Sequence, residues 1–146
     1  MPDKVFIDSN IILYLYSEDE LFKQHKAQEI LDIHNNTIIS TQVINEVSNV
    51  LFKKFRLSAI DVEKVILEID KNMKIVDYSL KTQINAVRLK DKYGFQYYDA
   101  LIVSTALEQG CSILFSEDMQ NNQIINNSLQ IINPFNNYLQ EKDRNL

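Results

Sequence analysis

The amino-acid sequence predicts an α/β protein, in which a central parallel sheet of four to five short strands is covered by helices in a three-layer α/β/α arrangement. Its short apolar runs do not alternate with polar residues, which is typical of strands buried on both faces. Segments with helical periodicity separate most of these runs. Only two glycines and two prolines interrupt the 146 residues, so helices are expected to dominate.

The strands are predicted from apolar runs bounded by polar or turn residues. The first run stops at Asp8, where a carboxylate stands in place of an ordinary turn residue, and Pro134 ends the last. In chain order, strands are expected over residues 4–8 ("KVFID"), 37–40 ("TIIS"), 74–77 ("KIVD"), 112–115 ("SILF") and 129–132 ("LQII").

The helices are predicted from apolar residues at helical spacing and from capping signals. Ser58 with Asp61 three residues later indicates an N-cap, and Gly94 and Gly110 each close a helix. The segment "DALIVSTAL" is apolar almost all round, so it is expected to be the most buried helix. In chain order, helices are expected over residues 9–16, 19–34, 41–52, 58–73, 79–93 and 98–109.

One domain over residues 1–146 is expected, because a chain of this length supports a core of its own. The polar segment 136–146 is expected to form a tail. Apolar runs such as "IILYLY" are far shorter than the roughly 20 residues of a membrane span. No signal-peptide pattern follows Met1, and a single cysteine, Cys111, excludes an internal disulfide. A cytoplasmic protein is therefore expected.

Four segments carry an acidic residue to one predicted edge of the sheet. Asp8 ends the first strand, and Asp118 follows the fourth strand. Glu46 lies in the second turn of the helix after the second strand, and Asp99 lies in the first turn of the buried helix. Functional groups of parallel α/β sheets collect beyond the carboxyl ends of the strands. These four carboxylates are therefore predicted to converge.

Each of these acids alone also has a structural explanation, as an N-cap, a solvated side chain, a helix-dipole partner or a turn residue. Together they would repel one another and raise one another's pKa, and a cation would remove that penalty. Oxygen ligands without Cys or His suit Mg²⁺ or Mn²⁺ better than Zn²⁺. Asp99, at a helix N-terminus, is expected to stay ionised.

The segments "VFIDSNIILY", "STQVINEVSNVL", "YYDALIVSTALEQG" and "ILFSEDMQ" resemble the four acidic motifs of PIN-domain ribonucleases, above all those of the toxins of VapBC toxin–antitoxin pairs. The resemblance spans about residues 4–134. It implies a PIN fold, Mg²⁺- or Mn²⁺-dependent endoribonuclease activity on RNA, a homodimer, and an antitoxin protein that wraps the toxin and often pushes a basic side chain toward the acidic site.

The resemblance also carries catalytic and metal-binding roles onto Asp8, Glu46, Asp99 and Asp118, with Asn10 and Thr41 as supporting polar groups. Asp8 and Asp99 are the expected direct ligands. Glu46 and Asp118 are expected to hold water, orient the nucleophile or bind a second ion. The sequence departs from the family pattern at Ser9, where Thr is common, and at Asn121-Asn122, where close relatives often carry His-Gly.

Basic and other reactive residues add no second site. The net charge of −5 argues against non-specific nucleic-acid binding, but the four site acids and a divalent ion account for much of that charge. The cluster "FKKFRL" is expected at a helix C-terminus, opposite the acids, where it complements the helix dipole. Cys111 is interpreted as packing. His25 and His34 are expected on opposite faces of one helix, so neither is assigned a catalytic role.

Three different functions also remain compatible with the sequence. A phosphatase or phosphoacceptor domain also places an acid after its first strand, but Asn10 stands where a haloacid-dehalogenase-like enzyme has a second Asp. A receiver domain needs a lysine near its last strand, and none follows the predicted fourth or fifth strand nearby. A stand-alone PIN nuclease in RNA processing and a non-catalytic interaction module of the same fold would both keep the predicted elements.

The segment "SNIILYLYSEDELF" has more apolar residues than one short helix buries. Ile11, Ile12 and Leu15 are expected to face the sheet. Side chains left near the surface would either be covered by the next helices or form a groove for an amphipathic helix of the antitoxin. These side chains are Tyr14, Tyr16, Leu21 and Phe22.

Overall fold

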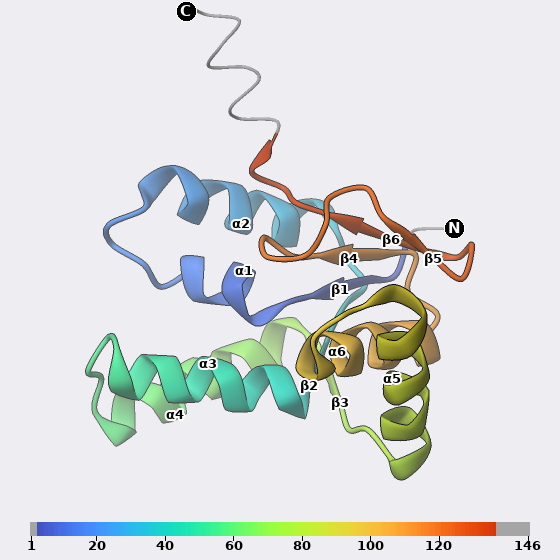
Figure 1. Cartoon of the computed structure of the whole chain (residues 1–146). Helices are drawn as coiled ribbons and strands as arrows, with labels where there is room; N and C mark the ends of the chain where they lie inside the picture. The colour runs from blue at the N-terminus through green and yellow to red at the C-terminus, as the bar shows by residue number, and fades with distance from the viewer. Residues whose placement is uncertain (1–2, 137–146) are drawn as a thin grey trace, which may run out of the picture.

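A computed structural model describes residues 3–136, which form six helices and one six-stranded sheet (Figure 1). The strands are β1 (Val5–Ile7), β2 (Thr37–Ser40), β3 (Lys74–Val76), β4 (Ile113–Phe115), β5 (Ile124–Ile125) and β6 (Leu129–Ile132). The helices are α1 (Ser9–Tyr14), α2 (Leu21–Ile33), α3 (Thr41–Lys53), α4 (Ala59–Asn72), α5 (Leu80–Tyr93) and α6 (Tyr97–Glu108). The predicted tail lies, apart from Asn136, outside the described residues.

The three-layer prediction is confirmed by the burial of the central strands. All three residues of β1 and all four of β2 are buried. Neighbouring side chains of a strand point to opposite faces, so both faces of the sheet must be covered. The most buried helix is α6, as predicted, with seven consecutive buried residues over 100–106. On the flanks α3 packs beside α4, and α5 packs beside α6 (Figure 1).

The structure adds one strand that the sequence did not predict. β5 has two residues and pairs antiparallel with β6, whereas every other pairing in the sheet is parallel. The turn between β5 and β6 holds Asn126 and Asn127 at φ 49° and 55°. Asparagine adopts positive φ more readily than other non-glycine residues, and paired positive-φ residues make tight hairpins. This Asn-Asn pair was the overlooked signal.

Most predicted boundaries agree with the structure to within a residue or two, because local caps define them. The Ser58 side chain accepts a hydrogen bond from the Asp61 backbone N–H, and Gly94 ends α5 at φ 79°. The short helix α1 ends at Tyr14, two residues before its predicted end. Within residues 3–136, none of the helices has both the length and the apolar character that crossing a membrane requires.

Strand order creates a switch point at the centre of the sheet. The order is β3-β2-β1-β4-β6-β5, so the chain moves outward from β1 through β2 to β3 and returns to β4 on the other side of β1. The Asp8 backbone N–H donates to the Phe115 carbonyl oxygen (3.0 Å), which joins the carboxyl ends of β1 and β4. Crevices at such switch points are the usual ligand sites of open α/β sheets.

Candidate functional site: four carboxylates at the switch point

Asp8 is the most deeply buried of the four predicted acids, with 5% of its surface exposed. It caps α1, because its Oδ1 accepts a hydrogen bond from the Ser9 backbone N–H at 2.7 Å. Its Oδ2 accepts a second hydrogen bond from the Ser116 hydroxyl at 2.8 Å. The N-cap explanation therefore applies to this residue, and the carboxylate is also held from the loop after β4.

Glu46 reaches the same place from α3. The Ser9 hydroxyl lies 3.4 Å from Asp8 Oδ1 and 3.4 Å from Glu46 Oε2, and its single proton can be donated to one of them at a time. Gln42, one turn earlier on α3 and buried, donates from Nε2 to Glu46 Oε1 (3.1 Å) and to the Tyr98 carbonyl oxygen (3.0 Å). Gln42 thus ties Glu46 to the first turn of α6, which also carries Asp99.

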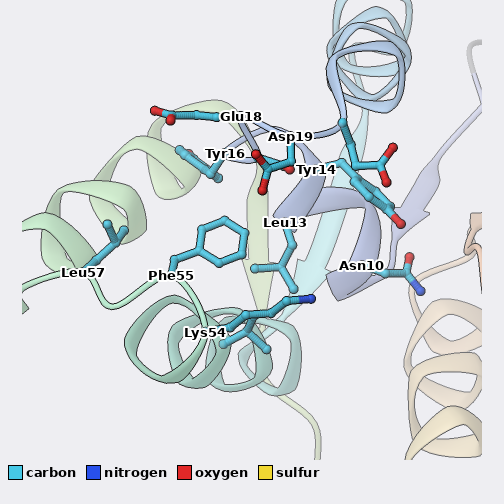
Figure 2. Close-up of a pocket in the computed structure, with 12 residues that line it drawn as sticks. Asn10, Leu13, Tyr14, Tyr16, Glu18, Asp19, Lys54, Phe55 and Leu57 are labelled. Carbon is cyan, nitrogen blue, oxygen red and sulfur yellow. The ribbon is translucent and has the colours of Figure 1, made fainter.

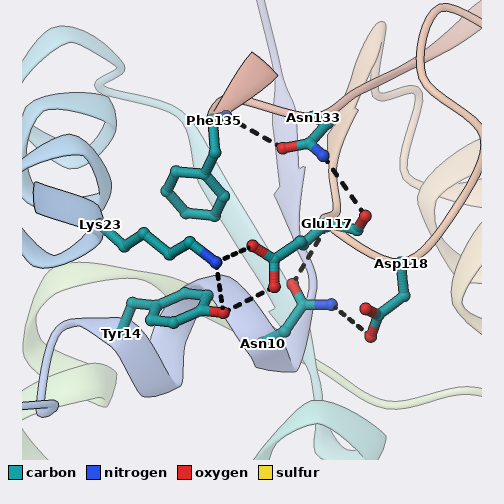
Figure 3. Close-up of polar contacts among 7 residues, drawn as sticks. All are labelled: Asn10, Tyr14, Lys23, Glu117, Asp118, Asn133 and Phe135. Atoms are coloured by element: carbon teal, nitrogen blue, oxygen red, sulfur yellow. Dashed lines mark hydrogen bonds and ion pairs between the residues drawn. The ribbon is translucent and has the colours of Figure 1, made fainter. Parts of the chain in front are cut away.

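Asp118 comes from the loop after β4 and is exposed. Its Oδ2 accepts a hydrogen bond from Asn10 Nδ2 at 3.0 Å, while Asn10 Oδ1 accepts from the Glu117 backbone N–H at 3.4 Å (Figure 3). One side chain on α1 therefore positions the loop that delivers Asp118. Asn10 has the supporting position that the family resemblance implied.

A second group of contacts anchors the same loop. Glu117 accepts hydrogen bonds from Lys23 Nζ (2.6 Å) and from the Tyr14 hydroxyl (2.6 Å), and Lys23 also lies 3.1 Å from that hydroxyl (Figure 3). The Lys23 ammonium lies 5.3 Å from the Phe135 ring centroid. These contacts join α1, α2 and the loop after β4, so Glu117 points away from the carboxylate cluster and toward the lysine.

The four acids influence one another electrostatically. The pKa of Asp8 is raised above its ordinary value, chiefly by burial and further by the charges of Asp99 and Asp118. Burial also raises the pKa of Glu46, with added repulsion from Asp8 and Asp99. The pKa of Asp99 is raised by burial and by Asp118. Burial and the neighbouring charge therefore act on the Asp99 pKa in the direction opposite to a favourable helix dipole.

The donor set fits a hard divalent cation, although the side chains do not form a closed cage. Among residues 3–136, no three Asp, Glu, His or Cys side chains are arranged closely enough to enclose a metal ion. Mg²⁺ is commonly held by one or two carboxylates together with water and substrate phosphate, so a closed cage is not required. Repulsion from neighbouring acids contributes to the raised pKa values of Asp8, Glu46 and Asp99, and a cation between the acids would relieve it.

Sequence reasoning missed the hydroxyl and amide groups that hold the acids, namely Ser116 and Gln42. Ser116 is fully buried directly after β4, and a polar residue in that position was an available signal. Thr41, an expected supporting group, makes no side-chain hydrogen bond to any residue in the range 3–136. Its neighbour Ser40 caps α3 instead. Cys111 is buried, and burial raises the pKa of its thiol to about 11, in agreement with a packing role.

Comparisons with known proteins identify the family. A family model described as "PIN domain" matches residues 5–124. Because this match covers well over half of the chain, the protein belongs to the PIN domain family. No match was found among curated protein sequences.

Solved structures with the same fold include several toxins. A toxin–antitoxin complex from Klebsiella pneumoniae is 20% identical with a TM-score of 0.67, covering 90% of this chain and 98% of that one. VapC20 of Mycobacterium tuberculosis, described as a sarcin–ricin loop cleaving toxin, is 12% identical with a TM-score of 0.65, covering 79% and 92%. DNA-bound VapBC from Salmonella typhimurium is 15% identical with a TM-score of 0.64, covering 88% and 96%. At these identities the likeness establishes the fold.

We predict that Asp8→Asn makes the metal-free protein more stable at neutral pH. The raised pKa means that the folded protein holds the Asp8 proton more tightly than the unfolded chain does. Stability from this group therefore falls as pH rises above the ordinary value of 3.8, and more of the cost of the buried charge is present at neutral pH than at pH 4. Asparagine removes that charge and still caps the helix.

Thermal unfolding in EDTA, followed by circular dichroism from pH 4 to pH 8, measures the difference. Each kcal/mol recovered raises the melting temperature by roughly 3–4 °C in a chain of this size. The gap between variant and wild type should widen with pH and close when Mn²⁺ stabilises the wild type alone. Asp91→Asn, at an exposed position on α5, is the matched control. A variant less stable at every pH would show that the hydrogen bonds to the ionised carboxylate outweigh its burial cost.

Proposed function

We propose that this protein is a single-domain, Mg²⁺- or Mn²⁺-dependent endoribonuclease, the toxin of a VapBC-type toxin–antitoxin pair. The observation that supports the proposal is the electrostatic coupling of Asp8, Glu46, Asp99 and Asp118 near the switch point of a PIN-family sheet. The fold shared with VapC20 and VapBC supports the toxin assignment.

In the proposed reaction, water adds to the phosphorus of an RNA phosphodiester and one P–O ester bond breaks, leaving a phosphate monoester and a hydroxyl end. A bound divalent ion would lower the pKa of a water molecule and stabilise negative charge on the phosphate and on the leaving oxygen. Asp8 and Asp99 would hold the ion. Glu46, whose pKa is raised, is suited to accept the proton of the attacking water. Asp118, positioned by Asn10, would orient water or bind a second ion.

Cleavage should depend on both the acids and the cation. Asp8→Asn and Asp99→Asn should each lower the rate of RNA cleavage by about a hundredfold or more, because each removes a ligand while keeping the shape of the side chain. Gel assays with end-labelled single-stranded RNA, with Mn²⁺ or with excess EDTA, measure the effect. Asp91→Asn, purified in parallel, should cleave like the wild type. Undiminished cleavage by either site variant, or in EDTA, would contradict the proposal.

A groove beside the site fits the proposed antitoxin. A cavity of about 710 Å³ opens between the α1–α2 segment and the C-terminal end of α3 (Figure 2). Apolar side chains line it, including Leu13, Tyr16, Phe55 and Leu57, and Asn10 connects it to Asp118. Acidic residues over 18–20 form one rim, opposite Lys54 (Figure 2).

The structure changes the composition of this groove relative to the sequence prediction. Tyr14 and Tyr16 line it as expected, but Leu21 and Phe22 do not. Phe22 packs partly buried against the core, and Leu21 is exposed on α2. An apolar floor with a mainly acidic rim fits an amphipathic antitoxin helix that carries basic residues. Such a helix would bring a basic side chain toward the carboxylates and exclude RNA from them.

Phe55→Ala should weaken antitoxin binding by about tenfold or more, because a buried aromatic anchor contributes strongly to an interface. Calorimetric titration of the antitoxin encoded beside this gene measures the change. Phe52→Ala, at a 47%-exposed position on α3 outside the groove, is the matched control and should bind like the wild type. Equal affinities for both variants would place the antitoxin elsewhere.

The proposed homodimer has a candidate surface on α5. Leu80, Ile84 and Val87 are 71%, 45% and 57% exposed, and their spacing places them on one helix face. Light scattering in solution should give twice the 17.1 kDa of one chain. Ile84→Glu should yield the single-chain mass, because a charge at the contact is costly to bury. Leu67→Glu, at a 60%-exposed position on α4, should stay dimeric. A wild-type monomer would contradict the dimer.

A further inference from the structure

A second cavity, which we call the side pocket, opens directly onto the acidic site. Its volume is about 550 Å³, within the range of roughly 300–1,000 Å³ that small-molecule sites occupy. Its wall includes Asp99 and Asp118 from the site itself. The wall also includes one aromatic residue and three glutamines, namely Phe95, Gln96, Gln120 and Gln123.

The side pocket and two of the acids, Asp99 and Asp118, belong to the same two stretches of chain. Gln96 is the N-cap residue of α6, three positions before Asp99, and its side chain makes no capping hydrogen bond. Gln120 lies two positions after Asp118, in the loop between β4 and β5. A group in the side pocket therefore lies immediately beside a phosphodiester held at the carboxylates.

The chemistry of the wall selects an uncharged, flat group with a hydrogen-bonding edge. No lysine or arginine lines this pocket in the described part of the chain, and its two carboxylates repel phosphate. Each glutamine amide offers both donors and an acceptor. Within residues 3–136, the side-chain amides of Gln96, Gln120 and Gln123 bond to no other residue. Phe95 is half-buried and adds an aromatic ring for stacking.

We propose that the side pocket binds one unpaired nucleobase of the RNA, next to the bond that is cleaved, and so contributes to sequence preference. Single-stranded RNA is recognised by bases that stack on aromatic side chains and hydrogen-bond through their edges. The amides of Gln96 and Gln120 read the edge of the base, and Phe95 contacts its face. The inference rests on the proposed ribonuclease function and adds the substrate group taken at this position.

The test combines changes in the protein with changes in the RNA. Wild-type protein with Mn²⁺ is assayed on a single-stranded RNA and on a series of copies of that RNA, each of which lacks one base near the cleaved bond. Removing the base that enters the side pocket should lower kcat/KM by about tenfold or more, because stacking and edge contacts are lost. In the Gln96→Ala/Gln120→Ala variant, removing the same base should lower kcat/KM less than it does in the wild type. This difference between the two proteins should lie mainly in KM.

Controls separate this binding role from a structural one. Gln83→Ala on α5, outside the side pocket, should keep the wild-type penalty at every position. Phe95→Leu, which preserves an apolar side chain, should reduce the penalty at the same base as the glutamine variant. Circular dichroism melting confirms that each variant is folded, and the glutamines are suitable targets because Gln96 and Gln120 are exposed.

The possible outcomes are distinguishable. No cleavage by wild-type protein in any metal would refute the proposed function as a whole. Cleavage with the same base-removal penalties in wild type, the glutamine variant and Phe95→Leu would overturn only the nucleobase assignment. If removing a base lowers kcat/KM equally in the wild type and the glutamine variant, but the glutamine variant binds the antitoxin more weakly, the side pocket belongs to the antitoxin. That result would also overturn the nucleobase assignment.

Discussion

Burial of a carboxylate at the end of β1 is the constraint on which the rest of the site depends. Asp8 is nearly inaccessible to water, so its charge must be met by hydrogen bonds or by a cation. Ser9 and Ser116 supply the hydrogen bonds, and each joins a different part of the chain to the acid. Burial still leaves the pKa of Asp8 raised, and the charges of Asp99 and Asp118 raise it further, which makes the switch point attractive to a divalent ion.

Neutral side-chain amides attach two of these carboxylates to other segments of the fold. Gln42 holds Glu46 against the start of α6, and Asn10 holds Asp118 against α1. An amide can orient a carboxylate without neutralising it, so the negative potential of the site is preserved for a cation or a basic side chain. The one ion pair nearby, Lys23 with Glu117, stabilises the loop from its outer side and leaves Asp118 unpaired with any lysine or arginine among residues 3–136.

Two concave surfaces of different chemistry flank this negative centre. The groove along α1 is apolar with a mainly acidic rim, whereas the side pocket beside α6 is lined by amides and an aromatic ring. The difference suits two different occupants, a basic amphipathic helix on one side and an uncharged base on the other. Because Asn10 lines the groove and also holds Asp118, an occupant of the groove would contact the group that positions one of the proposed catalytic acids. Inhibition and catalysis would then share one side chain.

The sequence by itself predicted most of the local elements and singled out the four candidate acids. Apolar runs, the Ser58 cap and Gly94 act over a few residues, so these elements were predictable. Strand order placed the ends of β1 and β4 side by side, and that arrangement depends on packing between distant segments. Only the tertiary structure decided that Ser116 and Gln42 hold the acids, that Asp99 has a raised pKa, and that Phe55 replaces Phe22 in the groove. Burial and long-range charge are properties of the assembled fold, which no local pattern encodes.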